Sequence, residues 1–320
     1  MVTRERLESN QVWVYMISLI IATIFGFLMP TYAESLGSII SIVIAFLMYS
    51  MFSQIPFTAL KKAFGNKRFM YALLTINFII VPIVVWLLSQ FLPDNPTILI
   101  GFYLVLLTPC IDYVIVFSSL GKGDEKLVLT ATPILFVAQM LLLPVYLWLF
   151  MGKDAVGVVE PSPFFEAFFG LIIIPLVFAL LLQIVAKRST IGVKVLGGSA
   201  WLPVPFMALT LFVVVASQII KLSTYGDQVI KVIPLYVMFM VIMPIIGKYV
   251  AAWFNLGTGA GRALIFSGST RNSLVVLPLA LALPEIGDVV AAVIITQTII
   301  ELLFELVYIR VVPNFLLQDK

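Results

Sequence analysis

The chain has 320 residues, of which 62% are hydrophobic and 11% are charged, and its mean hydropathy is +1.14. A soluble domain of this length has too little interior to hide so much apolar surface, so the composition places the chain in a lipid bilayer. The absence of histidine removes the commonest metal ligand and proton carrier, and a single cysteine excludes an internal disulfide. No zinc-binding, redox, nucleotide or dinucleotide motif occurs, so we expect neither a metal nor a cofactor.

Apolar runs long enough to cross a bilayer as helices follow one another along the whole chain. They cover residues 12–30, 36–58, 69–91, 98–120, 127–150, 164–186, 199–220, 231–254, 262–283 and 288–312. No stretch remains for a soluble domain. The sequence therefore predicts an all-α integral membrane protein with ten transmembrane helices.

The basic residues are unequally divided when alternate loops are placed on opposite sides of the membrane. One side carries thirteen of them: Arg4, Arg6, Lys61, Lys62, Lys67, Arg68, Lys122, Lys126, Lys187, Arg188, Lys194, Arg262 and Lys320. The other side carries Lys153, Lys221 and Lys231. This bias follows the positive-inside rule and predicts that both termini lie in the cytoplasm, with the protein in the plasma membrane. Since the net charge of +3 reflects topology, we expect a small-molecule substrate and no nucleic-acid partner.

The longest polar connection, GKDAVGVVEPSPFFE (152–166), divides the ten runs into five and five. We expect one membrane domain made of two repeats, residues 1–151 and residues 152–320. An odd number of helices in each half makes the second half enter the membrane from the opposite side. This is the inverted repeat that many secondary transporters have.

The fourth and ninth runs each contain polar and helix-breaking residues at the same depth. At an offset of 160 residues, GFYLVLLTPCIDYV (101–114) aligns with GRALIFSGSTRNSL (261–274). Pro109 removes a backbone donor and clashes with the preceding turn, so we expect the fourth helix to stop near Leu107 and restart at Pro109. Proline is common in membrane helices, but a polar cluster beside the break in both halves predicts two discontinuous helices. The freed backbone groups must then face protein or a watery cavity.

Ionisable residues deep in the runs are the second unusual feature, because a charge at the bilayer centre costs about 2.5–3.5 kcal/mol. They are Asp112, Arg271, Glu301 and Glu305. The repeat alignment puts Asp112 opposite Asn272 and therefore beside Arg271. We predict an ion pair between Asp112 and Arg271 where the two breaks cross. Such a pair either fixes the crossing or takes part in transport, and the sequence leaves both roles open.

Two of these acids share one stripe of the last run, since Gln297, Glu301 and Glu305 are spaced by four residues. Acids on one stripe are typical of a proton route. We expect Glu301 to take part in proton transfer. For Glu305 we expect neutralisation by Lys248 or Arg310 near the cytoplasmic surface.

Uncharged polar residues surround the two breaks. Cys110 is either an inert small hydrophobe or, beside a helix start, a thiol with nucleophilic and ligand character. The mid-span amide of Asn77 is expected to join helices rather than to bind a ligand. Together with Asp112 and Arg271, the residues expected to bind the substrate are Thr108, Cys110, Ser269, Thr270 and Asn272.

Ten spans, a five-plus-five repeat and broken fourth and ninth helices resemble the bile acid/sodium symporter superfamily over essentially the whole chain. Within it, TPCIDYVIVFSSLGKGDEK (108–126) and FSGSTRNSLVVLPLALALP (266–284) are similar to the arsenical-resistance branch of arsenite efflux permeases. In that branch the fourth helix carries a Pro-Cys pair, which Pro109 and Cys110 match. The resemblance implies export of trivalent arsenic, with Cys110 touching the metalloid.

The ninth run departs from both branches of this superfamily. The best-known arsenite exporters have a pair of Asn residues followed by an acid, where this chain has Arg271, Asn272 and then Leu274. The sodium-coupled branch has Glu and Gln as sodium ligands, and the matching positions here are Ser267 and Arg271. A guanidinium at a cation site repels sodium and takes its place, so we expect no sodium coupling through that site.

We therefore predict a secondary active transporter, not an enzyme, that exports arsenite or a related metalloid by proton antiport on Asp112 or Glu301. The alternative is an organic-anion carrier of the same fold, sodium-coupled or not, that binds a carboxylate at Arg271. An aspartyl intramembrane protease is disfavoured because Asp124, the second acid such an enzyme needs, lies in a lysine-flanked loop. A passive channel explains buried charge at a broken-helix crossing less well than an alternating-access carrier.

Overall fold

The computed structural model describes residues 6–7, 10–54, 65–111, 113–158, 169–283 and 286–319. This part of the chain is helical and contains no β-strand. Asp112, and with it the predicted ion pair, lies outside the described residues, as do residues 159–166 of the polar connection. The chain forms two compact units. Unit 1 comprises Met1–Ile55, Pro161–Gly226 and Pro278–Asp288, and unit 2 comprises Pro56–Glu160, Asp227–Leu277 and Val289–Lys320.

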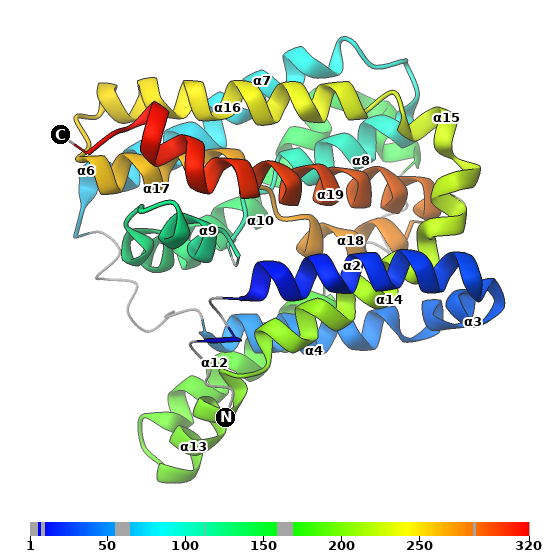
Figure 1. Cartoon of the computed structure of the whole chain (residues 1–320), viewed down its shortest axis with the longest axis horizontal. Helices are drawn as coiled ribbons and strands as arrows, with labels where there is room; N and C mark the ends of the chain where they lie inside the picture. The colour runs from blue at the N-terminus through cyan, green and yellow to red at the C-terminus, as the bar shows by residue number, and fades with distance from the viewer. Residues whose placement is uncertain are drawn as a thin grey trace. The chain divides into compact units, whose positions relative to one another are not determined.

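Unit 1 is built from helices of both predicted halves of the chain. They are α2 (Gln11–Leu28), α3 (Pro30–Ser35), the 3₁₀-helix η1 (Leu36–Ile39), α4 (Ile40–Gln54), the π-helix η4 (Phe169–Ile173), α12 (Ile174–Ala186), α13 (Thr190–Ser199) and α14 (Pro203–Thr224). Helix α2 runs along α14, and α4 packs against α12 and α14 (Figure 1). The rings of Phe25 and Phe212 lie 5.5 Å apart between α2 and α14. Unit 1 therefore brings segments together that lie far apart in the sequence.

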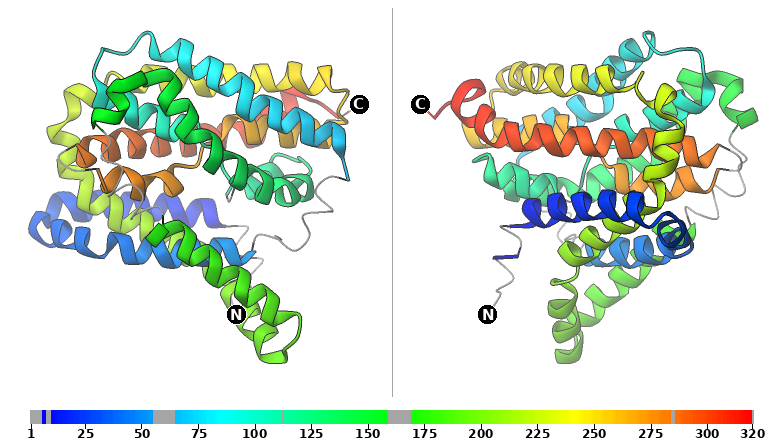
Figure 2. Two further views of the ribbon diagram at one scale, coloured as in Figure 1. Left: turned by 180° about the vertical axis from the view of Figure 1, so that it is seen from behind. Right: turned by 45° about the vertical axis from the view of Figure 1, so that its right-hand side comes forward.

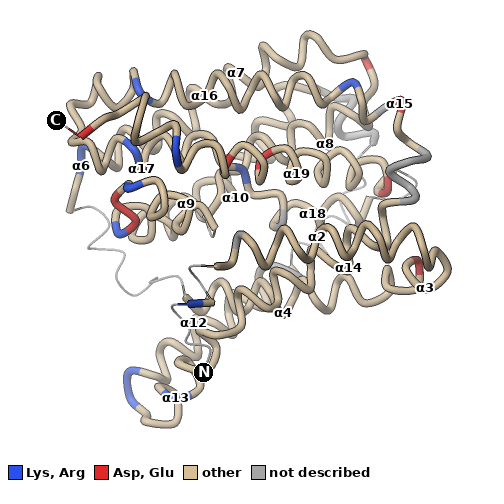
Figure 3. The backbone as a smooth tube through the Cα atoms, viewed as in Figure 1, with Lys and Arg blue, Asp and Glu red and all other residues tan. Residues whose placement is uncertain are grey.

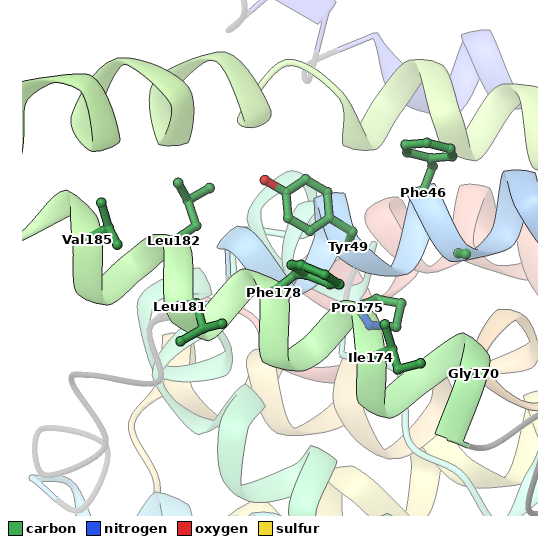
Figure 4. A pocket seen from close by; sticks show the side chains of 10 residues that line it. Phe46, Tyr49, Gly170, Ile174, Pro175, Phe178, Leu181, Leu182 and Val185 are labelled. Atoms are coloured by element: carbon green, nitrogen blue, oxygen red, sulfur yellow. The ribbon is translucent and has the colours of Figure 1, made fainter.

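A groove of about 570 Å³ lies in unit 1 and is lined mainly by α4 and α12 (Figure 4). Its walls are apolar side chains such as Phe46 and Phe178, and the hydroxyl of Tyr49 is its main polar group. No residue that lines it is ionisable at neutral pH. The groove therefore offers no group that could bind a charge or carry a proton.

Unit 2 holds the remaining helices. They are α6 (Lys67–Thr75), the π-helix η3 (Ile76–Ile80), α7 (Val81–Ser89), α8 (Pro96–Leu106), α9 (Val114–Leu120), α10 (Glu125–Val158), α16 (Ile233–Trp253), α17 (Thr258–Ser269), α19 (Gly287–Val311) and the π-helix η5 (Val312–Leu316). The short helices α15 (Gly226–Val229) and α18 (Ser273–Leu281) contain residues of both units. Helix α16 lies alongside α17 (Figures 1 and 2).

Local sequence explains where several of these helices begin. The side chain of Asn95 accepts a hydrogen bond from Thr97 N at 3.0 Å, and Pro96 occupies the first turn of α8, where no intrahelical donor is needed. The side chain of Asn66 likewise caps α6. The π-turn of η3 comes immediately before Pro82, whose ring cannot follow a regular α-helical turn. This turn carries Asn77 into the interior of unit 2.

Five described helices, counting helices that continue into one another as one, are long and apolar enough to cross a bilayer. They are Pro30–Gln54, Lys67–Ser89, Glu125–Gly152, Ile233–Trp253 and Gly287–Leu316. A sixth span results if Thr190–Ser199 and Pro203–Ile219, which are bent by 42° at a short break, count as one. Trp13–Leu28, Pro96–Leu106 and Ile174–Ala186 are apolar but shorter. The all-helical membrane class is confirmed, while the count of ten spans stays a prediction.

Arg262 does not lie where the sequence predicts it, among the basic residues of the loops. It lies within α17, and its side chain is 3% exposed. Its guanidinium donates to Leu317 O at 2.9 Å, Lys122 O at 3.2 Å and Pro313 O at 3.4 Å, and forms an ion pair with Asp319 at 2.9 Å. This residue therefore fastens the C-terminal segment and the loop after α9 to unit 2.

Candidate functional site

Both predicted interruptions are present in unit 2. Helix α8 ends at Leu106 and α9 begins at Val114, while α17 ends at Ser269 and α18 begins at Ser273. The predicted restart at Pro109 is wrong, because the chain stays non-helical for several residues beyond that proline.

The two interruptions meet as a short antiparallel crossing, in which Pro109 lies opposite Arg271. Cys110 N donates to Thr270 O at 3.1 Å, and Asn272 N donates to Thr108 O at 2.8 Å. These two bonds flank the pair of Pro109 and Arg271, so that pair is a non-hydrogen-bonded one. The missing N–H of proline is not needed at such a position, which explains why Pro109 lies in extended chain and does not begin a helix.

The crossing is fully enclosed. Six of the seven residues predicted to bind the substrate lie in it, each with 0% exposure: Thr108, Cys110, Ser269, Thr270, Arg271 and Asn272. The seventh, Asp112, lies outside the described residues. The hydroxyl of Thr108 donates to carbonyls of its own helix, and Asn272 Oδ1 accepts from Val275 N at 3.2 Å, which caps α18. These side chains therefore stabilise the ends of the broken helices.

The Arg271 guanidinium is held by neutral oxygen atoms. Its Nη2 donates to Asn77 Oδ1 at 2.8 Å and to Ser267 O at 2.7 Å, and its Nη1 donates to Leu106 O at 3.4 Å. Its Cζ lies 5.7 Å from the centre of the Phe239 ring, and its Nε has no hydrogen-bond partner in the described part of the chain. Within the described residues no carboxylate forms an ion pair with this guanidinium.

Asn77 acts as the interhelical contact that the sequence predicts. Besides accepting from Arg271, it donates through Nδ2 to Leu73 O at 3.1 Å and to Ser267 Oγ at 3.2 Å. It therefore links the π-turn of η3 to both α17 and the crossing. Its position at a π-helical turn is typical of residues near functional sites.

Glu301 of α19 is a carboxylate in direct contact with the backbone of the crossing, and it has 0% exposure. Its Oε2 accepts from the backbone N of Arg271 at 2.7 Å and from Gln297 Nε2 at 2.6 Å, and its Oε1 accepts from Tyr113 Oη at 2.6 Å. The bond from Gln297 confirms the shared stripe on α19. Tyr113 is not among the site residues predicted from the sequence, although its position directly after Asp112 was an available signal.

Glu305 contradicts the prediction that a basic residue neutralises it. It has 0% exposure, and neither Lys248 nor Arg310 forms an ion pair with it. Arg310 is five residues further along α19, so it points about 140° away around the helix. Instead, Glu305 Oε1 lies 2.7 Å from Thr270 Oγ1. Figure 3 shows acidic and basic positions gathered around the middle of α19, away from the charged helix ends.

Cys110 is fully buried within the crossing, and as the single cysteine of the chain it forms no internal disulfide. No group of three or more Cys, Asp or Glu side chains within the described residues could hold a metal ion. A soft ligand that reached this point would therefore meet one thiol, backbone amides and neutral hydroxyls.

Enclosed charges at the meeting of two interrupted helices are typical of membrane transporters. The profile of the Sodium Bile acid symporter family matches residues 41–225, which is more than half of the chain. The chain belongs to this family, and thus to a class of membrane transporters. The match includes the interruption between α8 and α9, whereas the one between α17 and α18 lies beyond it. No curated protein sequence matches the chain.

Proposed function

We propose that this protein is a secondary active transporter that exports arsenite or a related metalloid in exchange for protons. The observation that carries the proposal is the bond from Arg271 N to Glu301 at 2.7 Å. It joins a buried, proton-accepting carboxylate to the backbone of the crossing itself. A change in the protonation of Glu301 therefore changes the hydrogen bonding at the point where the two interrupted helices meet.

The proposed architecture has ten spans in two inverted repeats, residues 1–151 and 152–320, with both termini in the cytoplasm. The antiparallel crossing of α8 and α17 at their broken ends supports it, because helices from oppositely oriented halves run in opposite directions. Alternating access then consists of a rearrangement of the crossing that opens the enclosed site first to one side of the membrane and then to the other.

Proton coupling follows from the hydrogen bonds of Glu301. When this carboxylate is ionised, Tyr113 donates to it through a short, charge-assisted bond of 2.6 Å. When a proton binds at Oε1, the carboxyl group becomes a donor, and the Tyr113 hydroxyl donates to Arg271 O, 3.0 Å away. One proton thus rearranges the bonds on the backbone of Arg271. Asp112 is the alternative to Glu301 that we propose for this proton transfer.

Arg271 supports coupling without sodium. Three oxygen atoms surround its guanidinium, those of Asn77, Ser267 and Leu106. Oxygen atoms of this kind are what hard cations bind. A permanent positive charge already satisfies them, so we expect transport that does not depend on sodium.

The substrate class rests on Cys110. Thiolate sulfur is a soft ligand that suits soft metal centres, and Cys110 is the only cysteine of the chain. We propose that it contacts the metalloid when the crossing opens. The neighbouring hydroxyl and amide groups of Thr108, Ser269, Thr270 and Asn272 then contact the oxygen atoms of arsenite.

The test uses inside-out vesicles from cells that lack other arsenic pumps. We expect an acidic lumen to drive arsenite uptake, with or without sodium, and Cys110→Ser to abolish it. The matched control is Glu34→Gln, which changes an exposed side chain of α3 and should transport normally. Uptake that ignores the proton gradient, or that Cys110→Ser leaves intact, contradicts the proposal.

A second candidate is an organic-anion carrier, and the surroundings of Arg271 favour it. Its charge is buried without an ion pair in the described chain, and Nε is free to donate. Such a group attracts a carboxylate. In the same vesicles, uptake of a radiolabelled bile acid that survives Cys110→Ser but is lost in Arg271→Gln would favour this candidate over the first.

A further inference from the structure

The hydroxyl of Thr270 lies within hydrogen-bond distance of two acceptor oxygens but has only one hydrogen to donate. Its Oγ1 lies 2.7 Å from Phe266 O and 2.7 Å from Glu305 Oε1. A threonine hydroxyl has one hydrogen, and a backbone carbonyl oxygen only accepts. Two oxygen contacts this short each require a hydrogen. If Thr270 donates to Phe266 O, the hydrogen of the second contact must belong to Glu305.

The other oxygen of Glu305 points to the same conclusion. Glu305 Oε2 is buried and has no hydrogen-bond partner among the residues that the structure describes. An ionised carboxylate in that setting would bury a negative charge with at most one donor, which is costly. Glu301 is the contrast, because its Oε2 accepts from two N–H donors, those of Arg271 N and Gln297 Nε2. Two acids one turn apart thus have opposite surroundings, and this separates their protonation states.

The other ionisable groups near Glu305 supply no compensating charge. On its own helix, Glu301 adds a negative charge, and the Tyr308 hydroxyl donates to Met240 O on α16. Lys248 of α16 forms no ion pair with Glu305, and in the crossing the Arg271 guanidinium is bound to other acceptors. Glu305 is therefore surrounded by groups that favour a neutral acid.

We propose that Glu305 is a second proton-binding site of the transporter and that a proton occupies it in this conformation. The carboxylate takes up one H⁺ to become a carboxylic acid, and its O–H donates to Thr270 Oγ1. Thr270 also belongs to the crossing, since its carbonyl accepts from Cys110 N at 3.1 Å. When the crossing opens, Thr270 withdraws from Glu305 and the proton is released. Its part in transport rests on the proposed function, which then moves two protons in each cycle.

Infrared spectroscopy of the full-length protein in liposomes tests the protonation directly, without any substrate. A neutral carboxylic acid has a carbonyl-stretch band that an ionised carboxylate lacks and that shifts in D₂O. At neutral pH we expect this band to lose the intensity of one carboxyl group in Glu305→Gln and to keep it in Glu301→Gln. In Thr270→Val, which keeps the shape but removes the hydroxyl, the band should change frequency. The exposed-site control Glu34→Gln should leave it unchanged.

Two results would overturn the proposal: no loss of band intensity in Glu305→Gln, or the same spectrum in Thr270→Val as in the parent protein. If Glu305→Gln does not fold, the Thr270→Val spectrum alone decides. A failure of arsenite transport in vesicles would remove the proposed function but leave the band intact. If arsenite transport holds, the ratio of protons to substrate should fall by half in Glu305→Gln, and an unchanged ratio would show that the site takes no part in coupling.

Discussion

Replacing Glu301 by Gln and by Ala separates its role in folding from its role as a charge. In Glu301→Gln, the amide oxygen can take the place of Oε2 and keep the bonds from Arg271 N and Gln297 Nε2. The amide N–H then faces the Tyr113 hydroxyl, which donates onward to Arg271 O. The groups that contact Glu301 all keep a partner, so the variant resembles the protonated acid apart from the second N–H of its amide.

The magnitudes follow from counting the donors that lose their acceptor. Glu301→Ala leaves the backbone N–H of Arg271 and one N–H of Gln297 buried without partners. Each such group costs about 1–3 kcal/mol, so Glu301→Ala should lower the free energy of unfolding by about 2–6 kcal/mol. Glu301→Gln should lower it by less than Glu301→Ala does, because the N–H groups of Arg271 and Gln297 both keep their acceptor. Thermal unfolding of both purified variants in detergent measures the difference.

Transport assays of Glu301→Gln test the second role of Glu301, as a group that binds and releases a proton. Glu301→Gln should abolish arsenite uptake driven by a proton gradient, because the amide cannot give up a proton, while exchange of labelled for unlabelled substrate continues. A Glu301→Gln protein as unstable as Glu301→Ala would refute the reasoning. It would mean that the negative charge of Glu301, rather than its capacity as an acceptor, holds the crossing together beside Arg271.

Two further predictions concern unit 2 away from the crossing. Arg262→Ala deprives three carbonyls of their donor and should lower the free energy of unfolding by about 2 kcal/mol or more, whereas Asp319→Asn should change it by less than about 1 kcal/mol because Asp319 is 68% exposed. Gly121→Ala places a methyl group against ring atoms of Phe266, too close for ordinary contact, and should cost about 1–3 kcal/mol. Gly259→Ala, whose methyl group has no neighbour nearer than 3.8 Å, is its control. Equal midpoints of thermal unfolding within either pair would contradict these assignments.

Much of the crossing could be predicted from the sequence because its signals are local. Proline and glycine beside polar residues in an apolar run indicate a break, and a four-residue spacing places Gln297 and Glu301 on one helix face. The restart of the helix at Pro109 could not be predicted correctly. Whether a proline begins a helix or lies in extended chain depends on the segment opposite it, and that contact spans more than 160 residues of sequence.

The partners of the buried charges were hidden for a similar reason. Arg271 is held by Asn77 and by two carbonyl oxygens. Every residue has a backbone carbonyl, so a sequence does not indicate which of them accepts a hydrogen bond. For Glu305, an ion pair was predicted with Arg310, which is near in the sequence, or with Lys248, which is expected at a similar depth in the membrane. The helical rotation between positions 305 and 310 of α19 points Arg310 away from Glu305. A hydroxyl from the crossing contacts Glu305 instead.

The two backbone bonds that flank Pro109 and Arg271 fix the register of the crossing to a single residue. In extended chain, neighbouring side chains project to opposite faces, so a shift by one position would turn the guanidinium away from Asn77 and bring a threonine or an asparagine into its place. A single inserted codon beside the proline would therefore do what no point substitution does. It would leave every helix intact and exchange the side chains that point to the two faces of the crossing.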